Sequence, residues 1–82
     1  MTNNILYNKW DFWIDRGGTF TDIVAKDPLG KFHKKKILSY NPSHYKDSII
    51  EGINYFLKTK SKDKLNYKLI NEVRIGTTIA TN

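Results

Sequence analysis

The spacing of hydrophobic residues changes along the chain and predicts its elements. Two short runs rich in β-branched and aromatic residues, 11–15 and 20–26, flank a Gly-Gly pair, and a third alternating run covers 31–39. The turn-forming sequence Asp-Pro-Leu-Gly at 27–30 separates the second run from the third. Three strands joined by short turns predict an antiparallel β-meander.

Helical spacing follows the third run. Asn41 and Pro42 have the residue types of a helix N-cap and first helical position, so we expect the helix to begin there. Gly52 inside this helix indicates either close approach to a strand or simple tolerance of a glycine, and Asn54 lies away from the apolar stripe. The stripe repeats at three and four residues and comprises Tyr45, Ile49, Ile53, Phe56 and Leu57.

A lysine-rich connector, 58–68, leads into a further apolar run, 69–76. Because a helix intervenes, we expect this strand to be parallel to the first. The fold class is therefore α/β: a meander, a helix and a further parallel strand. The strand ends at Gly76, Thr77 and Thr78, in the position where α/β proteins gather ligands, although either threonine could instead begin the next helix.

The candidate chemistry lies between the first two runs, in the sequence Asp-Arg-Gly-Gly-Thr-Phe-Thr-Asp at 15–22. Gly17 and Gly18 allow a sharp turn that brings backbone N–H groups close to an anion, and Thr19 and Thr21 add hydroxyl donors. Asp15 is suited to Mg²⁺, directly or through water, because this ion prefers one or two carboxylates plus substrate phosphates. The alternative is a tight hairpin whose glycines only supply positive φ.

Other phosphate sites are excluded by their missing residues. Neither Gly-x-x-x-x-Gly-Lys-Ser/Thr nor Gly-x-Gly-x-x-Gly occurs. A phosphatase of the haloacid dehalogenase type would need an aspartate two residues after Asp15, where this chain has Gly17. If the loop binds phosphate, it belongs to a different class of phosphate-binding loop.

Composition limits the partners. Fourteen basic and eight acidic residues give a net charge of +6, which favours polyanions, but Lys34–Lys36 lie in an alternating strand that must divide them between two faces, so we expect no nucleic-acid partner. His33 and His44 lack metal-like spacing and are expected at the surface. No apolar stretch is long enough to span a membrane and there is no cysteine, so we expect a cytoplasmic protein without membrane contact.

Several separated motifs occur in a recognisable order: the octapeptide at 15–22, Lys-Ile-Leu-Ser at 36–39, Glu-Gly-Ile at 51–53 and Val-Arg-Ile-Gly-Thr-Thr-Ile-Ala-Thr-Asn at 73–82. Together they resemble the N-terminus of the hydantoinase A/5-oxoprolinase family, from about Trp10 to the last residue. The resemblance implies an actin-like ATPase (ribonuclease H-like) domain. It also implies ATP-dependent ring opening of a lactam or hydantoin substrate, in which a phosphoryl group moves to the amide oxygen before water opens the ring.

On this resemblance, Mg²⁺ is assigned to Asp15, directly or through water. Asp22 supports the loop, as does Thr21, which also counts among the candidate phosphate ligands. The residues assigned to the phosphates of ATP are Gly17, Gly18, Thr19, Thr21, Thr77 and Thr78.

Members of that family are much longer than 82 residues. We therefore expect residues 1–9 to be a flexible lead-in and residues 10–82 to be a partial domain, incomplete at its C-terminus, inactive alone and without a nameable catalytic base. Two alternatives stay open. The chain could be one part of a split enzyme completed by a complementing subunit, or a small basic module that binds anions through Lys34–Lys36.

Overall fold

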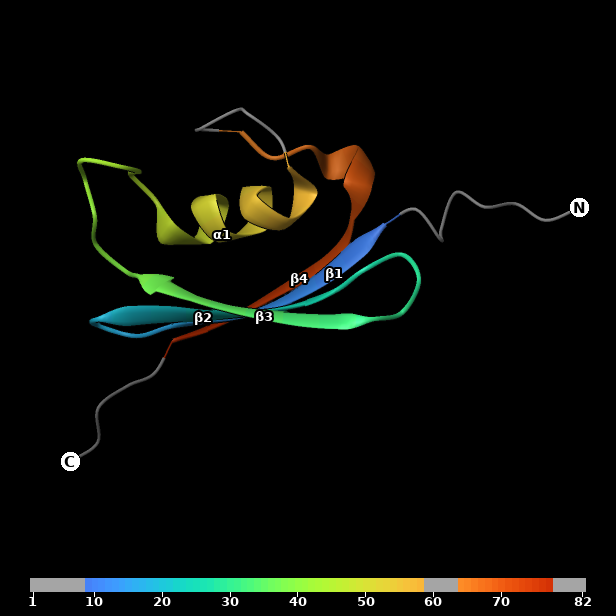
Figure 1. Cartoon of the computed structure of the whole chain (residues 1–82), viewed down its shortest axis with the longest axis horizontal. Helices are drawn as coiled ribbons and strands as arrows, with labels where there is room; N and C mark the ends of the chain where they lie inside the picture. Colours follow the sequence, from blue (N-terminus) through green and yellow to red (C-terminus); the bar gives the residue numbers. More distant parts are fainter. Residues whose placement is uncertain (1–8, 59–63, 78–82) are drawn as a thin grey trace, which may run out of the picture.

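The computed structural model describes residues 9–58 and 64–77, which form a four-stranded sheet with one helix on one face (Figure 1). The order of strands across the sheet is β3-β2-β1-β4. The elements are β1 (Trp10–Arg16), β2 (Phe20–Lys26), β3 (Phe32–Leu38), α1 (Ser48–Leu57), a short 3₁₀ helix η2 (Tyr67–Leu69) and β4 (Ile70–Thr77).

The pairing of the strands confirms the predicted α/β fold. β1 pairs antiparallel with β2, and β2 pairs antiparallel with β3, which gives the meander. After α1 the chain returns to pair β4 parallel to β1. Parallel pairing places the carboxyl ends of β1 and β4 at the same edge of the sheet, beside the β1–β2 connection.

The core lies between the sheet and α1. Alternate residues of β1 and β2 are buried on the helix side, and Ile53 and Leu57 of α1 close the core from above. Burying a large apolar side chain contributes about 1.5–3 kcal/mol, so these positions hold the layers together. The buried sheet residues are Phe12, Ile14, Ile23 and Ala25.

Gly52 marks the closest approach of helix and sheet. A Cβ built on this glycine would lie 2.9 Å from Cγ1 of Ile23 and 3.8 Å from Cδ1 of Ile37. The first distance is below any ordinary contact between carbon atoms. The prediction that Gly52 approaches a strand is confirmed.

The predicted helix start was wrong. α1 begins at Ser48, and its N-cap is Asp47, whose carboxylate accepts hydrogen bonds from the N–H groups of Ile49 and Ile50. The backbone carbonyl of Asn41 instead accepts hydrogen bonds from the N–H groups of His44 and Tyr45, which makes a separate turn before the helix. The phenol of Tyr45 donates to the carbonyl of Leu38, so this residue ties the turn back to β3 and is not part of the helical stripe.

The predicted position of Asn54 was also wrong. Its side chain is 6% exposed, and its Nδ2 donates to the carbonyl of Lys64 at 3.1 Å. An amide group between helix and connector can be buried because it bonds the backbone that covers it. Residues 1–8 of the predicted lead-in at 1–9, the connector residues 59–63 and the segment from Thr78 onward lie outside the described residues.

The sheet face opposite α1 has no described helix over it (Figure 1). It carries a mixture of aromatic and charged residues, among them Trp13 and Phe32, whose ring centroids are 6.0 Å apart. Nζ of Lys26 lies 5.8 Å from the centroid of the Phe32 ring. Within the described residues, no helix is long and apolar enough to cross a membrane.

Candidate functional site

The Gly-Gly segment forms a three-residue connection, Gly17–Thr19, between β1 and β2. The N–H of Gly17 donates to the carbonyl of Phe20 at 2.9 Å and closes the connection. In the parallel pairing, Asp15 lies opposite Gly76 and Arg16 opposite Thr77. The backbone thus brings both glycine-containing segments to one edge of the sheet, whereas Thr78 lies outside the described residues.

The glycines do not have the conformation that the plain hairpin alternative requires. Among the glycines that the structure describes, positive φ occurs at Gly30 alone. A Cβ on Gly17 would lie 3.0 Å from the carbonyl oxygen of Phe20, whereas Gly18 faces open space. Gly17 therefore allows close backbone approach, and the interpretation that both glycines only supply positive φ was wrong.

Two of the three carbonyl groups of the connection are engaged, and two of its N–H groups are available. Ser39 donates its backbone N–H to the carbonyl of Thr19 at 2.8 Å, and its Oγ to the carbonyl of Gly17 at 2.6 Å. Within the described part of the chain, the N–H groups of Gly18 and Thr19 donate to no other residue. An exposed loop that offers two N–H groups while two of its three carbonyls are bonded elsewhere suits an anion.

Beneath this loop lies a row of buried hydroxyls. Oγ1 of Thr21 is 2.9 Å from Oγ of Ser39 and 2.8 Å from Oγ of Ser48. Thr21 and Ser48 are fully buried and Ser39 is 7% exposed. Thr21 is thus placed to support the loop from the helix side of the sheet, in contrast to Thr19, which is exposed.

Two carboxylates lie beside each other on the opposite face. Asp15 and Asp22 are cross-strand partners and both are exposed. Nζ of Lys36 lies 3.8 Å from Oδ1 of Asp22. The described residues contain no cluster of three or more His, Cys, Asp or Glu side chains that could hold a metal ion. This donor set fits Mg²⁺ in one mode, with Asp15 as a protein ligand and phosphate oxygens as the others.

Ser39 and Ser48 were not identified as site residues from the sequence. Ser39 follows directly after β3, and Ser48 is the first residue of α1. Small hydroxyl residues at the ends of two elements are a weak signal, because such residues also cap and terminate elements without any ligand. Their contacts with Thr21 span 18 and 27 residues of sequence, so no local pattern could reveal them.

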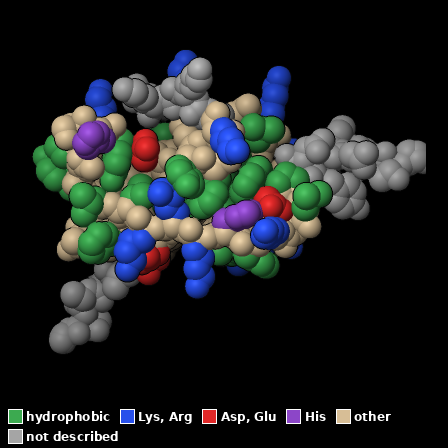
Figure 2. Space-filling view, viewed as in Figure 1, with side chains coloured by type: hydrophobic (Ala, Val, Ile, Leu, Met, Phe, Trp, Pro, Cys, Tyr) green, Lys and Arg blue, Asp and Glu red, His purple; other side chains and the backbone are tan. Residues whose placement is uncertain are grey.

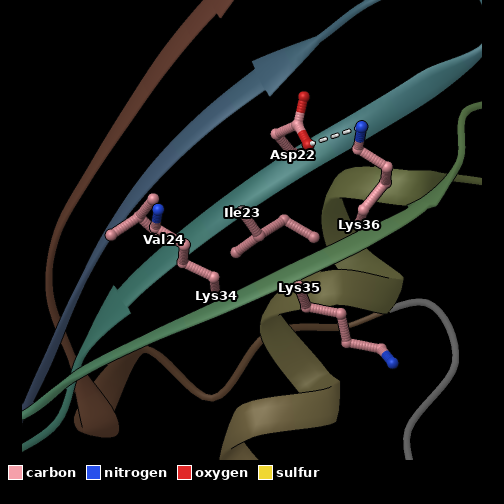
Figure 3. A pocket seen from close by; sticks show the side chains of 6 residues that line it. All are labelled: Asp22, Ile23, Val24, Lys34, Lys35 and Lys36. Carbon is pink, nitrogen blue, oxygen red and sulfur yellow. Dashed lines mark ion pairs between the residues drawn. The ribbon is translucent and has the colours of Figure 1, made fainter.

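The three lysines of β3 do not form one anion-binding surface. Lys36 pairs with Asp22 on the face away from α1, whereas Nζ of Lys35 lies 4.1 Å from the ring centroid of Tyr55 on the helix side (Figure 3). A pocket of about 400 Å³ beside these residues is also lined by Lys34 and Val24. Figure 2 shows basic side chains spread among hydrophobic and acidic ones. The predicted division of the lysines between two faces is confirmed.

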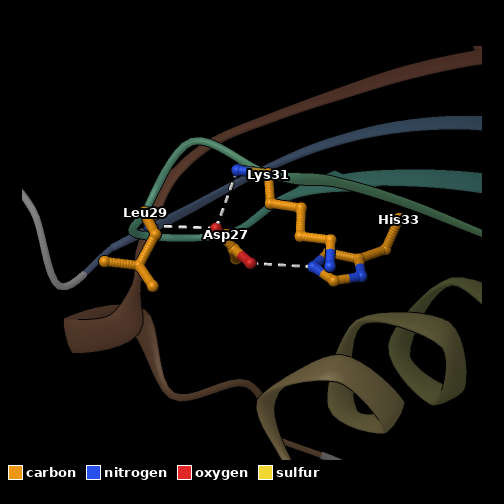
Figure 4. Close-up of polar contacts among 4 residues, drawn as sticks. All are labelled: Asp27, Leu29, Lys31 and His33. Atoms are coloured by element: carbon orange, nitrogen blue, oxygen red, sulfur yellow. Dashed lines mark hydrogen bonds and ion pairs between the residues drawn. The ribbon is translucent and has the colours of Figure 1, made fainter.

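A second polar cluster lies at the other end of the hairpin formed by β2 and β3. Oδ1 of Asp27 accepts hydrogen bonds from the N–H groups of Leu29 and Lys31, and Oδ2 is 2.8 Å from Nε2 of His33 (Figure 4). The hydrogen bond with His33, followed by that from Lys31, holds the pKa of the Asp27 carboxyl below its usual value. His44 is exposed, as expected, whereas His33 is only partly exposed because it lies beside Trp10.

Comparison with known proteins agrees with the fold. Residues 11–82 match the model of the hydantoinase/oxoprolinase N-terminal region. The chain is 41% identical over 88 residues to a 5-oxoprolinase of Dictyostelium discoideum, covering 100% of this chain and 7% of that protein. It is also 41% identical over 85 residues to 5-oxoprolinase 1 of Arabidopsis thaliana, covering 95% of this chain and 7% of the relative.

A 5-oxoprolinase of Saccharomyces cerevisiae is 37% identical over 78 residues, covering 84% of this chain and 6% of the relative. The chain thus spans about 7% of the length of the first two relatives. No solved structure matches it. The family model covers nearly all of the sheet and the whole loop between β1 and β2, and the chain belongs to the hydantoinase/oxoprolinase family.

Proposed function

We propose that this chain carries the first phosphate-binding loop of an ATP-dependent hydrolase that opens cyclic amides such as 5-oxoproline or a hydantoin. One observation carries the proposal: Ser39 bonds the carbonyls of Gly17 and Thr19, and the N–H groups of Gly18 and Thr19 stay available at the joined ends of β1, β2 and β4. Donors held in place before a charged group arrives need no reorganisation to stabilise it.

The residues divide into three roles. The N–H groups of Gly18 and Thr19, with the Thr19 hydroxyl, face the phosphates, and Asp15 holds Mg²⁺ directly or through water. Thr21 and Asp22 support the loop from the two faces of the sheet. Bound Mg²⁺-ATP would supply a phosphoryl group that activates the amide oxygen of the ring. Thr77, whose backbone pairs with Arg16, is the candidate contact from β4.

The cyclic-amide substrate is a further part of this proposal, and completion by a separate, complementing polypeptide is its alternative form. The matched relatives that are called 5-oxoprolinases extend far beyond the region shared with this chain. We therefore expect no ring opening by the 82-residue chain alone. Amide hydrolysis by this chain in isolation, measured as release of the ring-opened amino acid, would contradict that expectation.

Amide NMR spectra of the isotope-labelled chain, recorded with Mg²⁺-ATP, with ATP and excess chelator, and with Mg²⁺ alone, test the loop assignment. We expect dispersed peaks and shifts confined to residues 15–21 with Mg²⁺-ATP, and smaller shifts when the metal is withheld. Adenosine is the matched control because it lacks the phosphates. Equal shifts with adenosine and Mg²⁺-ATP, or no shift at 15–21 with Mg²⁺-ATP, would overturn the proposal.

A further inference from the structure

We propose that Ser39 is a positioning residue of the candidate loop, and that its hydroxyl keeps the loop's N–H groups available to a polyphosphate by holding the carbonyl of Gly17. This inference rests on the proposed function. It concerns a residue in the connection after β3, outside the Gly-Gly segment itself. The two residues are separated by 22 positions in sequence and joined by a hydrogen bond of 2.6 Å.

The positions of the protons in the row of hydroxyls follow from counting donors. The carbonyl of Gly17 can only accept, so the single hydroxyl proton of Ser39 is used in that bond. The bond between Ser39 and Thr21 must then be donated by Thr21, and the bond between Thr21 and Ser48 by Ser48. The row therefore runs one way, from Ser48 at the start of α1 to the loop carbonyl.

The direction of the hydrogen bonds matters because a phosphate-binding loop must not present free carbonyl oxygens to the anion. A carbonyl oxygen that faces an anion repels it, whereas an N–H group attracts it. Ser39 engages two carbonyls of the three-residue connection, that of Gly17 through Oγ and that of Thr19 through its backbone N–H. Only the first bond depends on the side chain. Ser39→Ala therefore releases one carbonyl and leaves the other bond in place.

A merely structural role can be separated from positioning with a second variant. Thr21→Val keeps the shape of the side chain and removes a hydroxyl that contacts both Ser39 and Ser48, but the bond from Ser39 to Gly17 remains possible. Both variants should lower stability, because each leaves buried polar atoms without a partner. Only Ser39→Ala removes the direct hold on the loop. Ser43→Ala is the control, since this exposed serine bonds Asn41 in the following turn.

The experiment is a titration of each chain with Mg²⁺-ATP, followed by amide NMR at residues 15–21, together with urea denaturation of the same samples. We expect Ser39→Ala to weaken binding about three- to tenfold, the size expected for loss of one hydrogen bond, and Thr21→Val to weaken it less than Ser39→Ala does. Ser43→Ala should bind like the unchanged chain. If Ser39→Ala does not fold, Ser39→Cys, which keeps the side-chain size and supplies only a weak donor, takes its place.

The outcomes separate the two proposals. Absence of any shift in the unchanged chain overturns the proposed function, and the role of Ser39 falls with it. Binding by the unchanged chain with equal affinity for Ser39→Ala overturns the role of Ser39 alone. If Ser39→Ala and Thr21→Val weaken binding in proportion to their losses of stability, the role of Ser39 is structural. That result also overturns its assignment as a positioning residue.

Discussion

Gly52 of α1 packs against Ile23 of β2 so closely that a methyl group on the glycine would overlap the isoleucine side chain. Replacing a helical glycine with alanine normally stabilises a helix by about 1 kcal/mol. Here overpacking, which costs about 1–3 kcal/mol, opposes that gain. We expect Gly52→Ala to lower the free energy of unfolding by up to about 2 kcal/mol, measured by urea denaturation.

Gly18→Ala is the matched control for this prediction. Its added methyl group meets open space, and the residue has no positive φ, so the change should stay within about 0.5 kcal/mol. A Gly52→Ala chain at least as stable as the unchanged chain would show that the Ile23 side chain can move aside without loss of stability.

Asp47, and not Asn41, should carry the helix cap. Asp47→Ala removes the acceptor for two N–H groups of α1, and we expect a loss of about 1 kcal/mol in the free energy of unfolding. Asn41→Ala should cost less than about 0.5 kcal/mol, because its side chain only accepts a weak bond from exposed Ser43. Urea denaturation of both variants measures the difference, and equal losses would argue against Asp47 as the dominant cap.

The Asp27–His33 pair should make stability depend on pH in the acid range. The pKa of the Asp27 carboxyl is lowered in the fold, chiefly by the hydrogen bond with His33. Its contribution is therefore fully present above the carboxyl's unfolded pKa of about 3.9 and is lost as pH falls through the lower folded value. Asp27→Asn should flatten the dependence of the unfolding midpoint on pH below about 4.

Carboxyl-carbon NMR of the Asp27 side chain provides a direct check. In His33→Phe, which keeps a ring near Trp10 and removes the hydrogen bond, the pKa of Asp27 should rise toward its usual value. An unchanged titration in that variant would mean that the N–H groups of Leu29 and Lys31 account for the lowering.

Asp15 should be required for the metal and not for the phosphates. We expect Asp15→Asn to weaken Mg²⁺-ATP binding at least about tenfold, because a coordinating carboxylate is lost. Binding of metal-free ATP should not weaken. Mn²⁺-induced broadening of amide signals at residues 16–19 provides the measurement. Asp22→Asn is the control, and broadening that disappears in Asp22→Asn and persists in Asp15→Asn would reverse the assignment of the two carboxylates.

The strands and the antiparallel meander could be predicted because burial imposes a period on the sequence and short turns join the first three strands. Phe12 and Ile14, or Ile23 and Ala25, alternate with exposed or half-exposed neighbours, and this spacing is visible without a structure. The start of α1 could not be predicted in the same way. Asn41 and Asp47 both have capping side chains, and the contacts that surround the second, such as that between Ser48 and Thr21, join distant parts of the chain.

In the candidate site, too, some residues could be predicted from local sequence and others could not. Asp15, Gly17, Gly18 and Thr19 could be chosen from one contiguous segment because turn formation and donor chemistry are local properties. Ser39, although part of the motif at 36–39, could not be assigned to the site because its contacts depend on the pairing of β2 with β3, which places the end of one strand beside the beginning of the other. Local sequence patterns identify the loop, whereas only tertiary contacts reveal that Ser39 bonds its carbonyls.

The row of hydroxyls that links Ser48 to the carbonyl of Gly17 couples the motion of the helix start to that of the loop. Helix ends ordinarily fray independently of distant loops. Here the first residue of α1 shares its hydrogen bonds, through Thr21 and Ser39, with the turn that connects β1 to β2. Unwinding of the first helical turn and loosening of the Gly-Gly segment therefore become one cooperative opening, and amide hydrogen exchange in the two segments should rise and fall together.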